Sequence, residues 1–277
     1  MSANGIAAIV VTYRSAETIA LCIQALKAST NVAEIRVVDN GSDDGTMDVV
    51  QSFSARDPRI RFIANPDNPG FATACNQGAS ASSALWLAFV NPDLIVEPDS
   101  LARLVEASAQ TAGGLVGAVL VDDKGQEDPA ARRRALDLAG MLRHSALRDL
   151  SVPRSEAPLQ RVEAVSGALM VMPRTTFNAV NGFDTDYRLH VEDLDLCRRI
   201  GEAGFEVVIA NEVRVHHVRG VSSRSRPWFV EWHKHRGLWR YYRKFDLARQ
   251  NVLTNCAVFA LIWSRFAWVS VRIAVKN

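Results

Sequence analysis

The side chains of this chain that could do chemistry stand in four short segments: 39–46, 91–93, 192–193 and 216–217. Asp93 follows the apolar run 84–90, and Pro92 ends that run. We therefore expect a strand buried on both faces that delivers Asp93 to its carboxyl end. Open α/β folds bind their ligands at that edge of the sheet. A carboxylate placed there can hold a divalent cation against a diphosphate.

Two further segments could complete such a site. Glu192 and Asp193 begin a predicted helix, where adjacent acids either stabilise the helix dipole or act in chemistry, with Asp193 as a general base and Glu192 shaping its surroundings. His216 and His217 follow a strand-like segment, and imidazole binds metals of the Mn²⁺ class or phosphate. A purely structural histidine pair is the alternative. The metal interpretation gains weight because Asp93 needs a second ligand.

The ends of the first strands could hold a nucleotide. Asp39 at a strand end can accept the imide N–H of uracil or thymine, and Tyr13, beside Thr12 at the end of the neighbouring strand, could stack on the base. In the run 68–78, Gly70 would let a phosphate approach a helix N-terminus closely. A turn, ordinary packing and a helix cap are the structural explanations of the same residues.

The elements that position these segments alternate regularly. Apolar strands at 6–11, 35–38, 60–63 and 84–90 are separated by predicted helices at 15–27, 46–53 and 70–79, a pattern that indicates a parallel sheet with right-handed crossovers. A polar excursion then runs over 122–158, and apolar segments return at 168–172 and 205–209. Within the helix at 192, Asp195 and Arg198 are spaced to form an ion pair.

Composition and charge limit the class of protein. The chain has 277 residues, 48% of them hydrophobic and 22% charged, which fits one large domain with a short appendage and excludes a disordered chain. A net charge of +2 argues against a general nucleic-acid binder. The four cysteines are scattered, which predicts neither disulfides nor a structural zinc site, and 6–11 is too short for an export signal. We therefore expect a cytoplasmic protein.

The last part of the chain is aromatic and basic. Trp228, Trp232, His235, Trp239 and Tyr242 recur on one face of a predicted helix, and a second apolar helix covers 256–275. Arg265 and Arg272 in that second helix argue against a full membrane span and favour an interfacial helix; packing on the main domain or on a second subunit is the alternative. The basic residues between 214 and 249 indicate an anionic partner such as a membrane surface or a lipid diphosphate, or a solvated helix face.

Taken in order, these motifs resemble family 2 glycosyltransferases, and more closely the bacterial rhamnosyltransferase-like branch, over residues 6–222. The resemblance is carried by Val11-Thr12-Tyr13, Val38 to Thr46, Asn68 to Gly78, Asn91-Pro92-Asp93, Val165 to Ala168, Gly182-Phe183-Asp184, Glu192 to Cys197, and His217 with Gly220 and Ser222. It implies an α/β fold of the GT-A type, the nucleotide-diphospho-sugar transferase fold, with a mostly parallel central sheet flanked by helices and a C-terminal helical appendage. Residues 1–222 would form this domain, with a nucleotide-binding half at 1–121 and an acceptor half at 122–222, and 223–277 the helical tail.

The resemblance also implies roles for individual residues. It assigns Asp193 as the catalytic base with Glu192 beside it, and Asp93 as a ligand of Mg²⁺ or Mn²⁺ with His217 as second ligand and His216 as its rival. The donor-binding residues would be Thr12, Tyr13, Arg14, Asp39, Asn68, Gly70, Phe71, Asn76, Asn91 and Asp93. Two positions depart from the family pattern: Asn91 replaces the first acid of the metal-binding motif, and Arg14 stands where this branch often has Asn, so that it would reach a phosphate or point to solvent.

The implied reaction is transfer, with inversion, of a sugar from a nucleoside diphosphate to a glycan or a polyprenyl-diphosphate-linked acceptor, in lipopolysaccharide, capsule or other surface-polysaccharide synthesis. A dTDP-linked 6-deoxysugar such as rhamnose is the first candidate donor and a UDP-hexose the second. Contact with the inner face of the membrane and homo-oligomerisation stay open. The rival functions are a nucleotidyltransferase, which the absence of glycine from 12–15 disfavours, and a non-catalytic nucleotide- or glycan-binding protein, which Asn91 favours and Glu192-Asp193 disfavours. The interpretation requires Asp39, Asp93, Asp193 and His217 to meet around one crevice.

Overall fold

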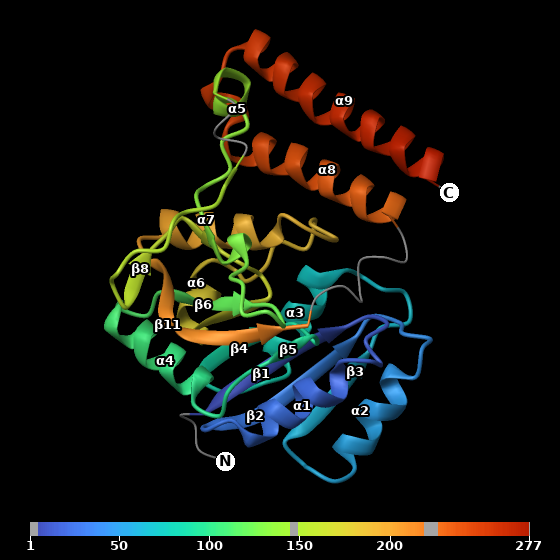
Figure 1. Ribbon diagram of the computed structural model, residues 1–277, viewed down its shortest axis with the longest axis vertical. Helices are drawn as coiled ribbons and strands as arrows, with labels where there is room; N and C mark the ends of the chain where they lie inside the picture. Colours follow the sequence, from blue (N-terminus) through green and yellow to red (C-terminus); the bar gives the residue numbers. More distant parts are fainter. Residues whose placement is uncertain (1–4, 145–148, 219–226, 277) are drawn as a thin grey trace.

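The computed structural model describes residues 5–144, 149–218 and 227–276 (Figure 1). The first half consists of strands and helices in strict alternation: β1 (Ile6–Thr12), α1 (Ile19–Ala28), β2 (Val32–Asp39), α2 (Thr46–Ser54), β3 (Ile60–Ala64), α3 (Phe71–Ser80) and β4 (Trp86–Val90). These four strands lie side by side in the order β3-β2-β1-β4, and every neighbouring pair is parallel. All seven residues of β1 are buried, as expected for a strand covered on both faces. The predicted alternation of strands and helices and the parallel pairing of these strands are therefore confirmed.

The second half of the chain extends the same sheet and adds short irregular elements. They are β5 (Leu94–Ile95), α4 (Ser100–Gln110), β6 (Leu115–Val121), the 3₁₀ turn η1 (Pro129–Ala131), β7 (Arg132–Arg133), α5 (Gly140–Arg143), β8 (Leu159–Arg161), β9 (Ala164–Val165), β10 (Leu169–Pro173), α6 (Arg174–Ala179), α7 (Glu192–Glu202) and β11 (Val207–His217). The full nine-stranded sheet has the order β3-β2-β1-β4-β10-β6-β11-β5, with β8 beside β11. A separate two-stranded sheet joins β7 to β9.

The central sheet is mixed rather than mostly parallel. β10 lies between β4 and β6 and runs antiparallel to both, and β5 and β8 run antiparallel to β11. The excursion 122–158, which the sequence predicts to be polar and partly helical, begins where β6 ends. The chain enters β10 at that same end of the strands, with Leu169 opposite Val90 at the end of β4, so β10 runs antiparallel to its neighbours. The excursion also contains η1, β7 and α5, so part of it is regular structure.

A helical tail packs on one side of this domain, as predicted. It comprises α8 (Pro227–Phe245), the 3₁₀ turn η3 (Leu247–Arg249) and α9 (Val252–Lys276). Figure 1 shows α8 above α7, and α9 as the outermost layer on α8. The predicted aromatic face of α8 makes the contact with α9: Trp232 packs against Trp263 with their rings tilted by 52°, and the Tyr242 hydroxyl donates a hydrogen bond of 2.6 Å to Asn255.

Ion pairs fix α8 to the main domain. Lys244 contacts both Asp184 and the fully buried Asp195, at 2.8 and 2.6 Å, and Arg240 contacts Asp184 at 2.9 Å. Part of the basic character of the tail is therefore structural. The expected pair of Asp195 with Arg198 was wrong: Asp195 pairs with Arg199 one full turn away, which leaves Arg198 to bridge α7 to Asp246.

Candidate active site

The first part of the site is the pair Asp93 and His217, which strand pairing brings together. β5 begins directly after Asp93 and pairs with the end of β11, where His217 lies opposite Leu94. The backbone N–H of Val218 donates to the carbonyl oxygen of Asp93 at 2.9 Å. As a result, Oδ2 of Asp93 lies 3.3 Å from Nε2 of His217, and both side chains are largely buried.

This pair fits a divalent cation. Within the described part of the chain, Oδ1 of Asp93 and Nδ1 of His217 are buried and have no hydrogen-bond partner, which is costly for polar atoms unless a ligand completes them. The described residues contain no group of three or more potential metal ligands. Mg²⁺ is commonly held by one or two protein carboxylates while water and substrate phosphates complete its shell. The donor set therefore suits a cation shared with a diphosphate.

His216 is turned away from Asp93. Successive side chains of a strand point to opposite faces, and the Nε2 atom of His216 lies 2.7 Å from Oδ1 of Asp123. The geometry thus favours His217 over His216 as the partner of Asp93. Asn91 is held by its backbone N–H, which donates to the carbonyl of Ala168 at 2.8 Å.

The second part of the site is Asp193 in the first turn of α7. Its Oδ2 atom accepts hydrogen bonds from the guanidinium of Arg133 and from the backbone N–H of Gly167, and its Oδ1 atom accepts from the N–H of Leu194 at 2.8 Å. Burial raises the pKa of this carboxyl, but the charge and hydrogen bond of Arg133 outweigh burial and hold the pKa below its usual value. Asp193 is therefore an anion with a fixed orientation.

Glu192 stands in the opposite state. It is buried, and burial together with the neighbouring charge of Asp193 raises its pKa to about 8. At neutral pH Glu192 is therefore mostly protonated, and the two adjacent acids together carry about one negative charge. These protonation states fit Asp193 as a charged base with Glu192 as its neutral neighbour.

The backbone before Asp193 is strained. His190 and Val191 have φ angles of 65° and 73°, in the left-handed region that a β-branched residue such as Val rarely adopts. Strain of this kind persists where the surrounding structure enforces it, and it gathers at functional sites. Gly237 of α8 packs on this turn, and a Cβ atom at that position would lie 3.1 Å from the carbonyl oxygen of His190. The tail thus supports the turn that presents Asp193.

Two residues of the excursion connect the two parts of the site. Asp128 lies 4.0 Å from Nδ1 of His217, and its charge acts on Arg133, which pairs with Asp193. The backbone also connects the two parts, because the N–H of Asn91 donates to the carbonyl of Ala168 while the N–H of the adjacent Gly167 donates to Asp193. Sequence reasoning missed both Asp128 and Arg133. The run of arginines at 132–134 was visible, but without the pairing of β7 with β9 it could not be connected to Asp193.

Asp39 lies at the same edge of the sheet and has the turn-forming role that was the structural alternative in the sequence analysis. Its carboxylate is 2% exposed and accepts four hydrogen bonds, from the hydroxyls of Thr12 and Ser42 and from the backbone N–H groups of Gly41 and Ser42. A carboxylate offers about four acceptor positions. Asp39 therefore closes the turn after β2. Its contact with a nucleotide base stays a prediction, and such a contact would require one of these four hydrogen bonds to break.

The run 68–78 is also used by the protein itself. The amide of Asn76 both donates to and accepts from the backbone of Phe183, at 2.8 and 2.9 Å. Gly70 is needed because a Cβ atom there would lie 2.5 Å from the carbonyl oxygen of Arg188, so the close approach is to this chain's own backbone. Phe71 packs edge-on against Phe183, and the carbonyl of Asn68 accepts from Arg188. Contacts of these residues with the nucleotide sugar stay predictions.

Arg14 is partly exposed and paired within the chain, and its contact with a phosphate stays a prediction. Its guanidinium makes two hydrogen bonds of 2.7 Å to the carboxylate of Asp43, and it also lies 5.6 Å from the ring centre of Tyr13. A phosphate would have to compete with Asp43 for this side chain. Gly220 and Ser222, which completed the His217 motif, lie outside the described residues.

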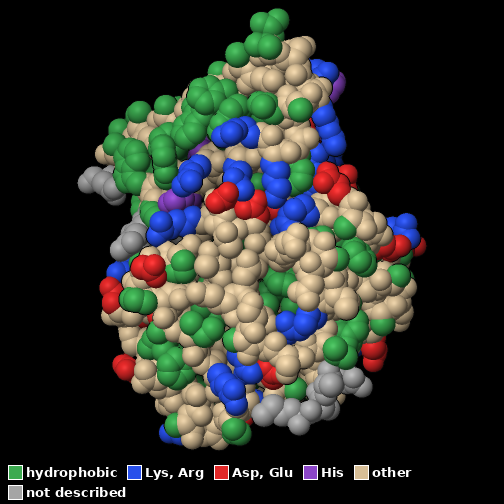
Figure 2. Space-filling view, turned by 180° about the vertical axis from the view of Figure 1, so that it is seen from behind, with side chains coloured by type: hydrophobic (Ala, Val, Ile, Leu, Met, Phe, Trp, Pro, Cys, Tyr) green, Lys and Arg blue, Asp and Glu red, His purple; other side chains and the backbone are tan. Residues whose placement is uncertain are grey.

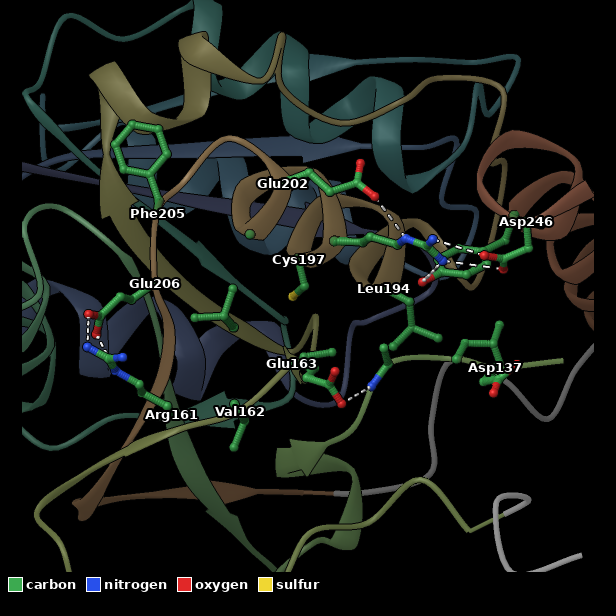
Figure 3. A pocket seen from close by; sticks show the side chains of 17 residues that line it. Asp137, Arg161, Val162, Glu163, Leu194, Cys197, Glu202, Phe205, Glu206 and Asp246 are labelled. Carbon is green, nitrogen blue, oxygen red and sulfur yellow. Dashed lines mark hydrogen bonds and ion pairs between the residues drawn. The ribbon is translucent and has the colours of Figure 1, made fainter. Parts of the chain in front are cut away.

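A cavity of about 560 Å³ lies beside α7 (Figure 3). Leu194 and Cys197 of α7 line it together with Glu163 and Phe205, and acidic side chains predominate at its edge. Its lining does not include Asp93, His217, Arg133 or Asp193. The cavity nevertheless adjoins the candidate active site, because Leu194 directly follows Asp193 and Cys197 lies about one helical turn after it.

Comparisons with known proteins agree with this geometry. The family model for glycosyl transferase family 2 matches residues 7–165. An N-acetylglucosaminyl-diphospho-decaprenol L-rhamnosyltransferase of Mycobacterium tuberculosis is 28% identical over 244 residues, which are 79% of this chain and 78% of that protein.

Among solved structures, GalNAc-T7 with UDP, GalNAc and Mn²⁺ superposes with a TM-score of 0.66 at 15% identity, covering 87% of this chain and 48% of that one. A mannosyltransferase of Pyrobaculum calidifontis with GDP-Man and Mn²⁺ superposes with a TM-score of 0.61 at 17% identity, covering 98% and 79%. These likenesses confirm the expected GT-A fold.

Proposed function

This chain belongs to glycosyl transferase family 2, and we propose that it transfers a sugar, with inversion, from a nucleoside diphosphate to a glycan or lipid-linked acceptor in cell-surface polysaccharide synthesis. A dTDP-linked 6-deoxyhexose such as rhamnose is the preferred donor and a UDP-hexose the second choice. The name of the mycobacterial relative, a rhamnosyltransferase acting on a diphospho-decaprenol acceptor, supports rhamnose and a polyprenyl-diphosphate-linked acceptor.

One observation carries the proposal: the segment that holds Asp93 and His217 meets the segment that holds Arg133 and Asp193. The backbone N–H of Asn91 donates to the carbonyl of Ala168, and the N–H of the adjacent Gly167 donates to Asp193. The first pair suits the diphosphate of a donor, and the second provides an oriented anion for an acceptor hydroxyl. A transferase needs these two functions on either side of one sugar carbon. A protein that only binds a nucleotide has no use for the second.

In the proposed reaction, the acceptor hydroxyl attacks the anomeric carbon from the side opposite the diphosphate. A bond forms from the acceptor oxygen to that carbon, the bond to the diphosphate oxygen breaks, and the hydroxyl proton passes to Asp193. Among the described contacts, Oδ1 of Asp193 accepts only one hydrogen bond, from Leu194, so it retains an acceptor position for the hydroxyl. The transition state has oxocarbenium character, as in other glycosyl chemistry.

Arg133 and Glu192 prepare the base. Arg133 holds Asp193 ionised and fixes its orientation, at the cost of some basicity, because the ion pair lowers the pKa of the carboxyl. Glu192 stays largely uncharged and so does not add a second anion beside it. Both residues act through Asp193.

On the donor side, Asp93 and His217 would hold Mg²⁺ or Mn²⁺. Such an ion, when bound, neutralises charge on the departing diphosphate. The orphaned atoms of this pair support the assignment, and so do the Mn²⁺ ions named with both solved structures. Asn91, a neutral amide where the family usually has an acid, leaves Asp93 as the charged ligand of its motif.

The proposal also includes the organisation and location of the chain. Residues 1–121 would bind the nucleotide, 122–222 the acceptor, and 223–277 would form the tail. A cytoplasmic location at the inner face of the membrane follows from a polyprenyl-linked acceptor. Whether the chain forms a homo-oligomer is a separate question that sedimentation would answer.

Incubation with nucleotide sugars tests the function and separates the rivals. The purified chain is mixed with dTDP-rhamnose or UDP-hexoses, Mn²⁺ and a short polyprenyl-diphosphate-linked N-acetylglucosamine, and nucleoside diphosphate is measured. A transferase releases nucleoside diphosphate faster when the acceptor is present, and NMR of the product shows the inverted anomer. Pyrophosphate release from a nucleoside triphosphate would instead indicate a nucleotidyltransferase. Nucleotide binding without any release would indicate a non-catalytic protein.

A further inference from the structure

The outer face of α9 is apolar and uncovered in the described structure. Over Val252–Val275 the helix is long and apolar enough to cross a membrane, with a mean hydropathy of 1.6, yet only 17% of its most apolar window is buried. Its most exposed large side chains are Leu253, Val275, Val252, Val271 and Trp268, between 59% and 82% exposed. A core helix of a soluble domain would be mostly buried. Figure 2 shows hydrophobic side chains gathered along the upper part of the molecule, where α9 lies.

The way α9 is attached determines how it could meet a membrane. Its inner face packs on α8 through Val258 and Ile262, which are nearly fully buried, and through an aromatic cluster in which Trp239 meets Phe259. α8 in turn is fixed to the domain by Lys244 and Arg240. If α9 crossed a bilayer in this arrangement, α8 and its paired charges would have to enter the hydrocarbon with it, which is costly. A position in the plane of the membrane avoids this cost.

The charges around the apolar face fit an anionic lipid surface. Arg265 and Arg272 are the only charged residues between 252 and 275, and both are exposed. Their spacing of seven residues places them on one side of the helix, beside the apolar face. The nearby exposed basic residues are Arg236, Arg243 and Arg249. The described tail contains two acids: Asp246 pairs with Arg198, and Glu231 lies 3.4 Å from Nδ1 of His235. Figure 2 shows Lys and Arg side chains below the hydrophobic band.

From this combination we propose that α9 lies in the interface of an anionic bilayer, with Leu253, Trp268, Val271 and Val275 in the acyl region and its arginines at the headgroups. Amphipathic helices bind in this way through buried apolar area together with attraction to anionic lipids. The proposal refines the membrane location that rests on the proposed function, but its test requires neither donor nor acceptor. Because α8 supports the strained turn before Asp193, the base would sit on a body held directly against the membrane.

Cys256 provides a site-specific probe. It is exposed near the start of α9, whereas Cys22, Cys75 and Cys197 are buried, so an environment-sensitive nitrobenzoxadiazole label will attach mainly at Cys256. The labelled full chain is mixed with phosphatidylcholine vesicles, with and without phosphatidylglycerol. We expect a blue shift and increased emission with the anionic vesicles. Unchanged emission with both kinds of vesicle would overturn the proposal.

Accessibility to dithionite separates a helix in the plane from a helix that crosses. A second preparation carries the label near the other end of the helix, as Ala274→Cys in a Cys256→Ser background. Dithionite added outside intact vesicles should quench both labels, because both ends stay in the outer leaflet. Protection of one label and not the other would show a span and contradict the proposal.

Matched variants test the surface itself. Leu253→Gln/Val271→Gln/Val275→Gln keeps good helix formers on α9 and should weaken vesicle partitioning by about tenfold or more. The control, Leu21→Gln/Phe62→Gln/Leu85→Gln, changes exposed apolar residues of the main domain and should leave partitioning unchanged. Arg265→Gln/Arg272→Gln should reduce the preference for anionic vesicles by about fivefold per arginine.

Sedimentation tests the alternative that this face of α9 binds a second copy of the chain. If the tail variant abolishes a dimer in solution while vesicle binding is absent in the wild type, the face is an interface between copies and the proposal is wrong. Equal far-UV circular dichroism and equal thermal midpoints of the tail variant and the wild type would show that the fold is intact. A loss of vesicle binding could then be assigned to the surface alone.

Discussion

Two carboxylates at the same edge of the sheet are in opposite states. Asp39, at the end of β2, is buried and accepts hydrogen bonds from four donors of its own chain. Asp93, just beyond the end of β4, is also largely buried, but among the described residues its Oδ1 atom has no partner. A satisfied buried carboxylate stabilises its turn, whereas an unsatisfied one is costly unless something outside the chain completes it. The difference separates a structural acid from a binding one, although both follow a strand.

Asp193 is a third case. It is ionised and held by Arg133, yet one of its oxygens keeps room for another hydrogen bond within the described contacts. Asp193 is thus held in one orientation by hydrogen bonds, as Asp39 is, and it keeps a free acceptor position, as Asp93 does. A general base requires both properties. The comparison predicts that the three acids, changed to the nearly isosteric amide, will fail in three different ways.

The largest effect is expected for Asp193→Asn. An amide cannot take the proton of the acceptor hydroxyl, so turnover should fall by roughly 10²–10⁴-fold, the usual contribution of a general base. The affinity for nucleoside diphosphate should stay within about twofold, because the donor side is unchanged. Steady-state kinetics and calorimetry measure the two quantities. Wild-type turnover in this variant would remove Asp193 from its role.

Asp93→Asn should lower turnover by on the order of 10²-fold, since it weakens the hold on a cation that offsets charge on the leaving group. Thermal stability should be unchanged or slightly higher, because the change removes a poorly compensated buried charge. His216→Ala is the matched control: this histidine faces Asp123 and should keep its activity. A clear loss of stability in Asp93→Asn with turnover retained would mean that Asp93 is structural and that the comparison is wrong.

Much of the fold was predictable, because local signals and packing agree in the first half of the chain. The apolar run 84–90 and the proline after it placed Asp93 at the edge of the sheet, and the alternation of strands and helices gave the parallel order. The antiparallel entry of β10 was not predictable, since it depends on where the long excursion returns. No local pattern encodes that path.

For the site, sequence reasoning found the acids but not their partners. Asp93, Asp193 and His217 were identified from their positions after strands or at a helix start. Whether a carboxylate is satisfied depends on donors that arrive from elsewhere in the chain. Arg133 reaches Asp193 across 60 positions, so no local pattern could reveal it. Asn76 shows the reverse. Its motif predicted a contact with the nucleotide sugar, but its side-chain amide is hydrogen-bonded to the backbone of Phe183, 107 positions away.

Asp39→Asn should act on stability and much less on chemistry. The new amide group would face the N–H groups of Gly41 and Ser42 with donors instead of acceptors, which should cost about 2–3 kcal/mol of unfolding free energy. Turnover at a temperature where the variant is folded should change by less than about tenfold. Urea unfolding and initial rates provide the two readings. A collapse of nucleotide affinity at unchanged stability would give Asp39 the binding role that we have assigned to Asp93.

The last prediction concerns Glu192 and the pH dependence of stability, where little effect on turnover is expected. The folded protein raises the pKa of this acid from 4.5 to about 8, so the folded state holds its proton more tightly than the unfolded chain does. Its contribution to stability is fully present below about pH 4.5 and is lost as the pH rises toward 8. Glu192→Gln mimics the protonated acid and should make the unfolding free energy less dependent on pH across this window. Parallel pH profiles for the variant and the wild type would contradict this assignment.

The division between Asp93 and Asp193 is tested most directly by calorimetric titration of nucleoside diphosphate with and without Mn²⁺, in three proteins. We predict that Mn²⁺ tightens binding by about tenfold or more in the wild type and in Asp193→Asn, and has almost no effect in Asp93→Asn. Equal affinities with and without Mn²⁺ in the wild type, or a full Mn²⁺ effect in Asp93→Asn, would contradict it.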